Sequence, residues 1–159
     1  MWRTSLCGMS RPMSVDKTVA FIGAGNMAGA LIRGLISTGT VPAERIIAAD
    51  PDGARLDALH SELGVRTAEN NGEALSGADV VVLATKPQVF PIVLPALGAC
   101  LGTDTLIVSI AAGISSKIIE EALPAGARVV RTMPNTPALV GAGATAIAAG
   151  ADATDADLA

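Results

Sequence analysis

Residues 21–28 read Phe-Ile-Gly-Ala-Gly-Asn-Met-Ala, in which two glycines and an alanine have the spacing G-x-G-x-x-A. The segment follows a short β-rich run, Thr18–Ile22, and opens a helical pattern. Gly23 permits a tight turn, Gly25 lets the backbone approach a pyrophosphate, and Ala28 allows the helix to pack closely on the strand. The free N–H groups at such a helix N-terminus favour phosphate. The segment therefore predicts a dinucleotide-binding turn, although a tight strand-to-helix turn without a ligand has the same spacing.

Asp50 stands at the end of the second predicted strand. A carboxylate at this place can accept hydrogen bonds from adenosine ribose hydroxyls, and it would repel the 2′-phosphate of NADP. Asp50 therefore favours NAD. Arg55 lies within reach on the next helix and could offset the repulsion. A turn or helix-capping role before Pro51 is the alternative for Asp50.

Three more segments follow predicted strands: Ala84–Pro87, Ser109–Gly113 and Arg131–Pro137. Ligands of open α/β sheets bind at the carboxyl ends of the strands, so Lys86 and Asn135 are expected in a cleft. The small residues of Ser109–Gly113 would let a flat ring lie against the backbone. A surface lysine, a tight turn and a structural proline turn are the alternatives for the three segments.

The elements that would position these residues alternate between strands and helices. Strands are predicted at Thr18–Ile22, Arg45–Ala49, Val65–Thr67, Asp79–Ala84, Thr105–Ser109, Ala127–Arg131 and Ala144–Ala148. Helices are predicted at Asn26–Ser37, Asp52–Leu63, Asn71–Ser76, Gln88–Cys100 and Ser115–Leu123. The continuous apolar run at 79–84 is typical of a parallel strand buried on both faces. The pattern predicts an α/β fold with a doubly wound parallel sheet of the Rossmann type.

The composition narrows the function classes. Hydrophobic residues make up 50% of the 159-residue chain and charged residues only 16%, so we expect some apolar surface to meet a partner. A net charge of −4 and 2% aromatic residues argue against binding of nucleic acid. The uncharged stretch 132–151 contains prolines and glycines, which argues against a membrane span. Cys7 and Cys100 lie far apart with no metal motif, so reduced structural thiols and no metal site are expected.

Three segments are expected along the chain. Residues 1–16 are predicted to be a disordered leader, with an upstream start and Met9 or Met13 as the true beginning as the alternative. Residues 17–150 are predicted to be a dinucleotide-binding domain. Residues 151–159 resemble the opening of another helix, in which Thr154 could be the N-cap. We therefore expect a truncated helical domain to begin there.

Taken together, these motifs resemble the Δ1-pyrroline-5-carboxylate reductase family, which performs the last step of proline biosynthesis. The matching segments are FIGAGNMAGALIRGL (21–35), ATKP (84–87), VSIAAGI (108–114) and VVRTMPNTPALVGAGATAI (129–147). The resemblance implies an oxidoreductase with NADPH or NADH as cofactor, which delivers hydride to the cyclic imine of 1-pyrroline-5-carboxylate. It further implies a small-molecule substrate, a cytoplasmic location and a homo-oligomeric full-length form.

By position, the resemblance places the family's cofactor contacts on a set of residues at the strand ends. They are Ile22, Gly23, Ala24, Gly25, Asn26, Met27, Asp50, Asn71, Ala84, Thr85, Lys86, Pro87, Ala111, Ala112 and Gly113. Members that use NADPH usually have a small hydroxyl residue where this chain has Asp50. The family's C-terminal helical dimerisation domain is missing from this chain, so the fragment is expected to be inactive alone. No residue stands out as a proton donor, and Lys86 and Asn135 are named only as cleft candidates.

Two other functions fit the same motifs. One is a different Rossmann reductase, of the 6-phosphogluconate or ketopantoate type, against which residues 133–137 (MPNTP) argue. The other is a non-catalytic NAD(P)-binding module that regulates a partner. Turnover by the full-length gene product would separate an enzyme from a regulatory module.

Overall fold

The computed structural model describes residues 15–135, 137 and 143–158. The strands are β1 (Val19–Ile22), β2 (Ile46–Ala49), β3 (Arg66–Ala68), β4 (Val80–Leu83), β5 (Leu106–Ser109), β6 (Arg128–Pro134) and β7 (Thr145–Ala149). The α-helices are α1 (Asn26–Ser37), α2 (Gly53–Leu63), α3 (Asn71–Leu75), α4 (Phe90–Gly98) and α5 (Ser116–Glu121). Short 3₁₀ turns include η1 (Ala43–Arg45), η2 (Pro87–Val89) and η4 (Asp155–Asp157).

The strands form one seven-stranded sheet with the order β3-β2-β1-β4-β5-β6-β7. Strands β1 to β6 are all parallel, which confirms the doubly wound α/β fold. The sheet grows from β1 towards β3 on one side and from β4 towards β6 on the other, so the strand order reverses between β1 and β4. Ligands of such sheets bind at this switch, outside the carboxyl ends of the strands. The predicted site residues follow the carboxyl ends of parallel strands, so the fold brings them to the same end of the sheet.

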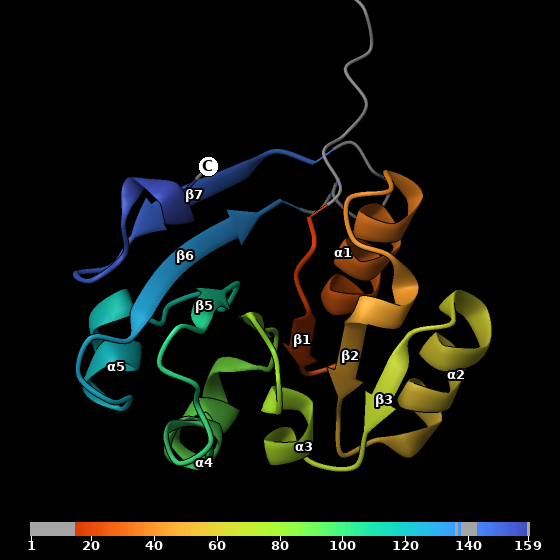
Figure 1. The fold of residues 1–159 in the computed structure, drawn as a ribbon, viewed down its shortest axis with the longest axis horizontal. Coiled ribbons are helices and arrows are strands. Elements are labelled where there is room, and N and C mark those ends of the chain that lie inside the picture. The colour runs from red at the N-terminus through yellow and green to blue at the C-terminus, as the bar shows by residue number, and fades with distance from the viewer. Residues whose placement is uncertain (1–14, 136, 138–142, 159) are drawn as a thin grey trace, which may run out of the picture.

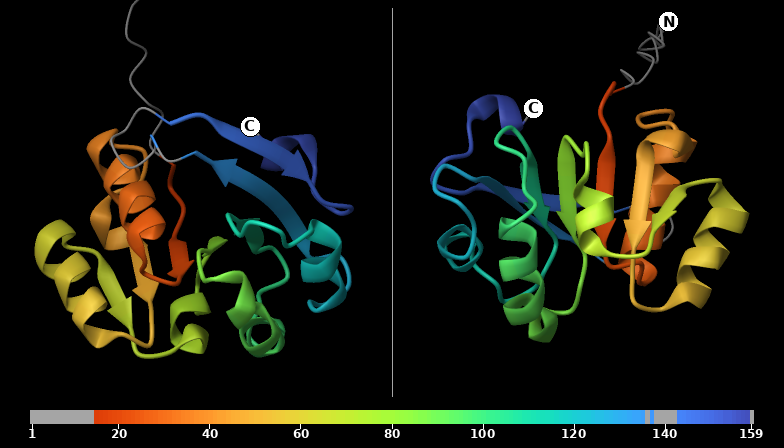
Figure 2. Two further views of the ribbon diagram at one scale, coloured as in Figure 1. Left: turned by 180° about the vertical axis from the view of Figure 1, so that it is seen from behind. Right: turned by 60° about the horizontal axis from the view of Figure 1, so that its bottom comes forward.

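The last strand corrects the expectation of a wholly parallel sheet, because β7 runs antiparallel to β6. Asn135 and Ala144 form a backbone hydrogen bond of 3.1 Å, which joins the two strands just beyond their paired residues. A parallel return would need a long crossover, usually a helix, whereas an antiparallel return needs only a short connection. Figures 1 and 2 show β7 lying along β6 at one border of the sheet.

The core lies on both faces of the sheet. One cluster of buried side chains packs β1, β4 and β5 against α3, α4 and α5, and a second packs β1 and β2 against α1 and α2. In β4, Val81 and Leu83 belong to the first cluster and Val82 to the second, so the apolar run is buried on both faces as predicted. Figure 1 shows α1 and α2 beside β1–β3, with α4 and α5 at the other end of the sheet.

Most predicted boundaries agree with the structure within a few residues, and α1 agrees fully. The largest error is β6, which was expected to end at Arg131 and continues to Pro134. Residues 130–134 are held in the strand by pairing with β7, a long-range interaction that the local pattern cannot show. The predicted helix at 88–100 is split into η2 and α4, with Pro91 at the start of α4 and Pro95 inside it.

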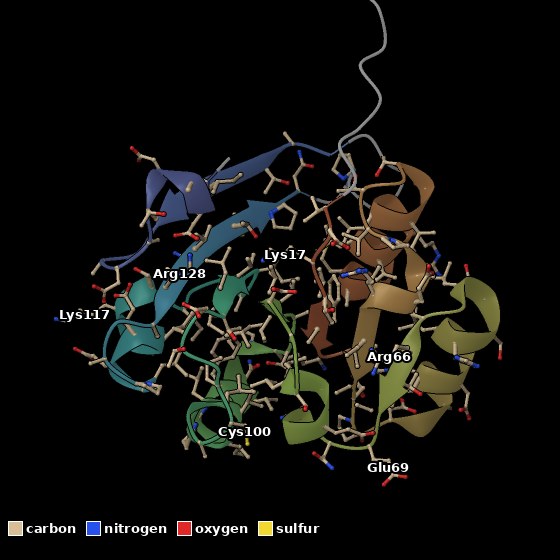
Figure 3. The ribbon with its side chains drawn as sticks, in the orientation of Figure 1. Lys17, Arg66, Glu69, Cys100, Lys117 and Arg128 are labelled. Atoms are coloured by element: carbon tan, nitrogen blue, oxygen red, sulfur yellow. The ribbon has the colours of Figure 1, made fainter. Side chains whose placement is uncertain are left out.

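The end of the described chain forms the short turn η4. Thr154 is its N-cap, and both the backbone N–H and the hydroxyl of Thr154 donate to the Asp157 carboxylate at 2.8 Å. Arg128 of β6, labelled in Figure 3, binds the same carboxylate at 2.6 Å. Thr154 is thus the N-cap of a 3₁₀ turn, and the predicted helical domain stays a prediction. Residues 1–14 of the predicted leader, Cys7 among them, lie outside the described residues, and the Val15 N–H donates to the Thr40 carbonyl at 2.7 Å. In the described part of the chain, no helix is long and apolar enough to cross a membrane.

Candidate functional site

The glycine-rich turn after β1 is held by both neighbouring strands. Gly23 has φ +100°, and a Cβ at this residue would lie 2.9 Å from the Ala84 carbonyl carbon and oxygen. The Gly23 N–H donates to the Ala49 carbonyl at 2.8 Å. Only glycine satisfies both the positive φ and the close approach to the end of β4. Gly23 therefore sets the shape of the turn, as predicted.

Gly25 has ordinary extended angles and is the N-cap of α1. A Cβ at Gly25 would meet no heavy atom within 4 Å, so nothing in the described protein requires a glycine at this place. No side chain caps α1 and no acidic residue occupies its first turn. The first N–H groups of a helix have no carbonyl partner within the helix. The turn and α1 thus form an open cradle of N–H donors suited to a pyrophosphate.

Asp50 is tied to the same turn. Its side chain is only 8% exposed, and its Oδ2 accepts a hydrogen bond from the Ala24 N–H at 2.8 Å. Its Oδ1 accepts from the Asp52 N–H at 2.9 Å, which closes the turn into α2. Asp50 therefore has the turn-forming role that was the alternative to ribose binding, and it also contacts the turn after β1. Each oxygen retains a second lone pair that a ribose hydroxyl could use.

A cavity of about 290 Å³ opens at the carboxyl ends of β1, β2 and β4. Its lining residues come from the strand ends and from α3 and α4, and they are Ile22, Gly23, Ala49, Asp50, Pro51, Glu69, Asn70, Asn71, Thr85, Val89 and Val93. The structure therefore brings together five predicted cofactor contacts, namely Ile22, Gly23, Asp50, Asn71 and Thr85. Figure 3 labels Glu69, in the short connection from β3 to α3.

Thr85, in the lining of this cavity, has an unpaired side-chain hydroxyl in the described structure. Its hydroxyl is buried and has no hydrogen-bond partner in the described structure. Buried hydroxyls are rarely left unpaired, so the Thr85 hydroxyl has a donor and an acceptor that a bound ligand could use. The open cradle at Gly25 and this hydroxyl together fit a bound dinucleotide.

The predicted contacts that follow β4 and β5 lie farther along the carboxyl end of the sheet. Lys86 is exposed and is the N-cap of η2. Ala111 is buried and its N–H bonds to the Ser109 hydroxyl at 3.3 Å, while Gly113 has φ +76°. These segments follow β4 and β5, so the dinucleotide would extend from the turn after β1 towards them.

Asn135 lies just beyond the end of β6, next to the start of β7. Its side-chain oxygen accepts a hydrogen bond from the Ala144 N–H at 3.0 Å, so this part of the amide joins β6 to β7. The stiff loop expected after the sixth strand is therefore partly strand, with Asn135 at its end. Thr136 lies outside the described residues.

Two further features of the structure were not predicted. The Arg131 Nε is buried without a hydrogen-bond partner in the described chain, and its Nη2 donates to the Ala111 carbonyl at 3.3 Å. An apolar groove of about 540 Å³ also lies between α1 and the strands β4–β7, and its lining includes Leu31, Val82 and Ile110. The low charge of the sequence was the only signal for such a groove.

Among the described residues, no three His, Cys, Asp or Glu side chains gather as metal ligands.

Comparison with known proteins gives a family and several relatives. The model of a family described as NADP oxidoreductase, coenzyme F420-dependent, matches residues 18–113. Pyrroline-5-carboxylate reductase 3 of Mus musculus is 42% identical over 142 residues, which is 89% of this chain and 52% of the relative. The pyrroline-5-carboxylate reductase of Pseudomonas aeruginosa is 48% identical over 133 residues, covering 84% and 48%. The chain thus spans about half the length of the curated relatives it matches.

A solved structure gives the same result. The pyrroline-5-carboxylate reductase of Coxiella burnetii superposes with a TM-score of 0.86 at 36% identity, covering 91% of this chain and 53% of that one. The resemblance found in the sequence motifs is therefore confirmed by the relatives in sequence and in structure.

Proposed function

The chain belongs to the family of NADP oxidoreductases described as coenzyme F420-dependent, and from this premise we propose that it is the cofactor-binding half of a pyrroline-5-carboxylate reductase. The single observation that carries the proposal is the uncapped N-terminus of α1 behind Gly25, open beside a cavity with an unpaired buried hydroxyl at Thr85. The similarity to reductases of this name supports the choice of substrate.

NADPH or NADH, when bound, supplies the hydride that reduces the cyclic imine carbon and yields L-proline. The residues of this chain bind and orient. The N–H groups at the start of α1 hold the pyrophosphate, and Asp50 accepts hydrogen bonds from the adenosine ribose. Thr85 donates its hydroxyl hydrogen at the cavity wall. Asn71 and the segments Ala84–Pro87 and Ala111–Gly113 line the remaining path of the cofactor.

The reacting imine would lie beyond the ends of β4 and β5. Lys86 is exposed there and free to turn towards a carboxylate substrate. Asn135 contributes through its amide nitrogen, since its oxygen is bound to Ala144. Neither side chain is assigned the proton transfer, and a second domain of the longer relatives would complete the substrate site.

We also propose a cytoplasmic location and a homo-oligomeric full-length protein, without nucleic-acid or membrane partners. The family resemblance and the chain's low charged fraction of 16% support this part of the proposal. Residues 17–150 act in it as the dinucleotide-binding domain.

The proposal is tested in two steps. NADH and NADPH are titrated into the 159-residue chain and into its Gly25→Val variant, and binding is followed by nucleotide fluorescence. The chain is then assayed with pyrroline-5-carboxylate, alone and extended by whatever the gene encodes beyond residue 159.

We expect binding by the parent chain, weaker binding by the variant, and proline formation only by the extended protein. Orientation of the imine by a second domain can be worth roughly 7–11 kcal/mol of barrier. Rapid proline formation by the 159-residue chain would overturn the proposal that this chain only binds the cofactor and that a second domain completes the substrate site. Cofactor binding without turnover in the extended protein would instead favour a regulatory module.

A further inference from the structure

Arg131, near the carboxyl end of β6, is an arginine to which the proposed function gives no role. Its register partner in β5 is Ser109, and residues paired in this way place their side chains on the same face of a parallel sheet. One pair earlier on this face, Ile107 and Val129 both belong to the core cluster packed against α3, α4 and α5. The guanidinium of Arg131 therefore extends over this helix-covered face, next to the turn that follows β5.

The Arg131 guanidinium has few partners for a group in this position. Its Nη2 donates to the Ala111 carbonyl at 3.3 Å, whereas its Nε is buried without a hydrogen-bond partner in the described chain. Among the residues that the structure describes, no carboxylate forms an ion pair with it. A guanidinium removed from water without a carboxylate partner costs free energy of folding. An apolar side chain would serve core packing better, so the arginine points to a need of the turn that it contacts.

The turn after β5 is held from two sides at Ala111, which is only 4% exposed. The Ala111 N–H donates to the hydroxyl of Ser109 at 3.3 Å, and the Ala111 carbonyl accepts from Arg131. The Ile110 N–H, one residue earlier, donates to the Leu83 carbonyl at the end of β4. Both peptide groups of Ala111 are thus fixed. Arg131 fixes the second of them, which leads out of the core into the exposed part of the turn.

The exposed part of this turn consists of Ala112 and Gly113. The adenosine ribose is expected at Asp50 after β2, and the pyrophosphate at the start of α1 after β1. Since β4 and β5 come next in the sheet, the nicotinamide half is expected at the turns that follow these two strands. A change at Ala111 should therefore reach the nicotinamide half of the cofactor and leave the adenosine half untouched.

We propose that Arg131 is a positioning residue for the nicotinamide half of the dinucleotide, and that it acts through the Ala111 carbonyl without contacting the cofactor. When the guanidinium is removed, the peptide group after Ala111 can rotate, and Ala112 and Gly113 lose the fixed place from which they orient the ring. The proposal rests on the dinucleotide binding proposed above and adds one residue to it. A purely structural arginine would instead affect the binding of all parts of the cofactor alike.

The test compares a ligand that reaches the turn after β5 with one that does not. Dissociation constants are measured for NADH and for 5′-ADP, which lacks the nicotinamide and its ribose. Arg131→Met removes the donors at similar side-chain length, and Arg131→Lys restores one donor group and the charge. Arg128→Met is the matched control, because Arg128 begins the same strand and binds Asp157 and the Asp104 carbonyl (Figure 3). Thermal melting verifies that each variant is folded.

We expect Arg131→Met to lose about tenfold or more in NADH affinity and less than about twofold in 5′-ADP affinity, as for the loss of one hydrogen bond to a charged group. Arg131→Lys should recover most of the NADH affinity, since its ammonium can still donate to the Ala111 carbonyl. Arg128→Met should melt at a lower temperature and bind both ligands within about twofold of the parent, because it shares no partner with Arg131.

Equal losses of NADH and 5′-ADP affinity in Arg131→Met would overturn the proposal, because they would show a general structural role. Parent-like NADH binding by a folded Arg131→Met would overturn it too, as would an Arg131→Lys that binds NADH no better than Arg131→Met. If Arg131→Met does not fold, Arg131→Gln takes its place, because its amide is too short to reach the Ala111 carbonyl, and the same outcomes decide. A folded parent chain that binds neither ligand would overturn the proposed function itself.

Discussion

The Asp50 carboxylate accepts a hydrogen bond of 2.8 Å from the Ala24 backbone N–H, and this contact ties the end of β2 to the glycine-rich turn after β1. The aspartate has a structural role in the turn besides any role towards the ribose. An N–H group of the turn that could otherwise face a phosphate is thereby occupied. The donors left for the pyrophosphate are those of the first turn of α1.

Asp50→Asn should therefore destabilise the chain and weaken NADH and NADPH together. The amide replaces one acceptor with a donor that faces a backbone N–H, which costs about 1–3 kcal/mol for a shielded group. Urea unfolding and cofactor titration measure the two effects. Asp52→Asn is the matched control: its side chain is 47% exposed, and its loss should change the free energy of unfolding by less than about 0.5 kcal/mol. Equal stability of both variants would contradict the structural role.

Gly25→Ala should lower the affinity for both dinucleotides by about tenfold or more, which corresponds to about 1.4 kcal/mol. The new Cβ would meet no heavy atom of the described residues within 4 Å, so the free energy of unfolding should not fall. Gly34→Ala, in the same helix and also with open space at the Cβ position, provides the control. It should stabilise α1 by about 0.5–1 kcal/mol and leave cofactor binding unchanged. Unaltered binding by Gly25→Ala would show that the pyrophosphate lies elsewhere.

Gly23→Ala, unlike Gly25→Ala, should destabilise the fold. The alanine would be forced to φ +100° and against the Ala84 backbone at 2.9 Å. A strained backbone and an overpacked contact each cost about 1–3 kcal/mol. The free energy of unfolding measured in urea should fall by about 2–6 kcal/mol, and cofactor binding should be lost as a consequence. A fully stable variant would mean that the turn can shift away from β4.

The Asp79 carboxyl should make stability fall at acid pH. The hydrogen bond from the Thr18 N–H, followed by that from Lys17, lowers the pKa of Asp79 below its usual value. A carboxyl with a lowered pKa in the folded state contributes stability above the unfolded pKa. That contribution is lost as the pH falls below about 4 and through the folded pKa. Asp79→Asn should flatten the pH dependence of urea unfolding on this acid side, and an unchanged pH dependence would contradict the role of Asp79.

Sequence patterns were sufficient for the elements whose signals are local. The strand at β1, the turn at Gly23 and Gly25 and the full length of α1 follow from apolar spacing and glycine chemistry. The direction of β7 and the extension of β6 to Pro134 depend on pairing between residues distant in sequence, which no local pattern contains. The partners of Asp50 and Asn135 were likewise beyond prediction, because each side chain contacts a backbone N–H on another segment.

The position of β1 between β2 and β4 also affects when the cofactor-binding turn can form during synthesis on the ribosome. Its first partner, β2, leaves the ribosome soon after it, but its second partner, β4, follows only much later. The Thr18 N–H, for example, finds its acceptor at Asp79, 61 residues further along the chain. Because Gly23 packs against Ala84, the cofactor turn reaches its final shape only when that residue has been synthesised. A nascent chain that stops before β4 would carry the whole glycine motif and still lack a finished binding turn.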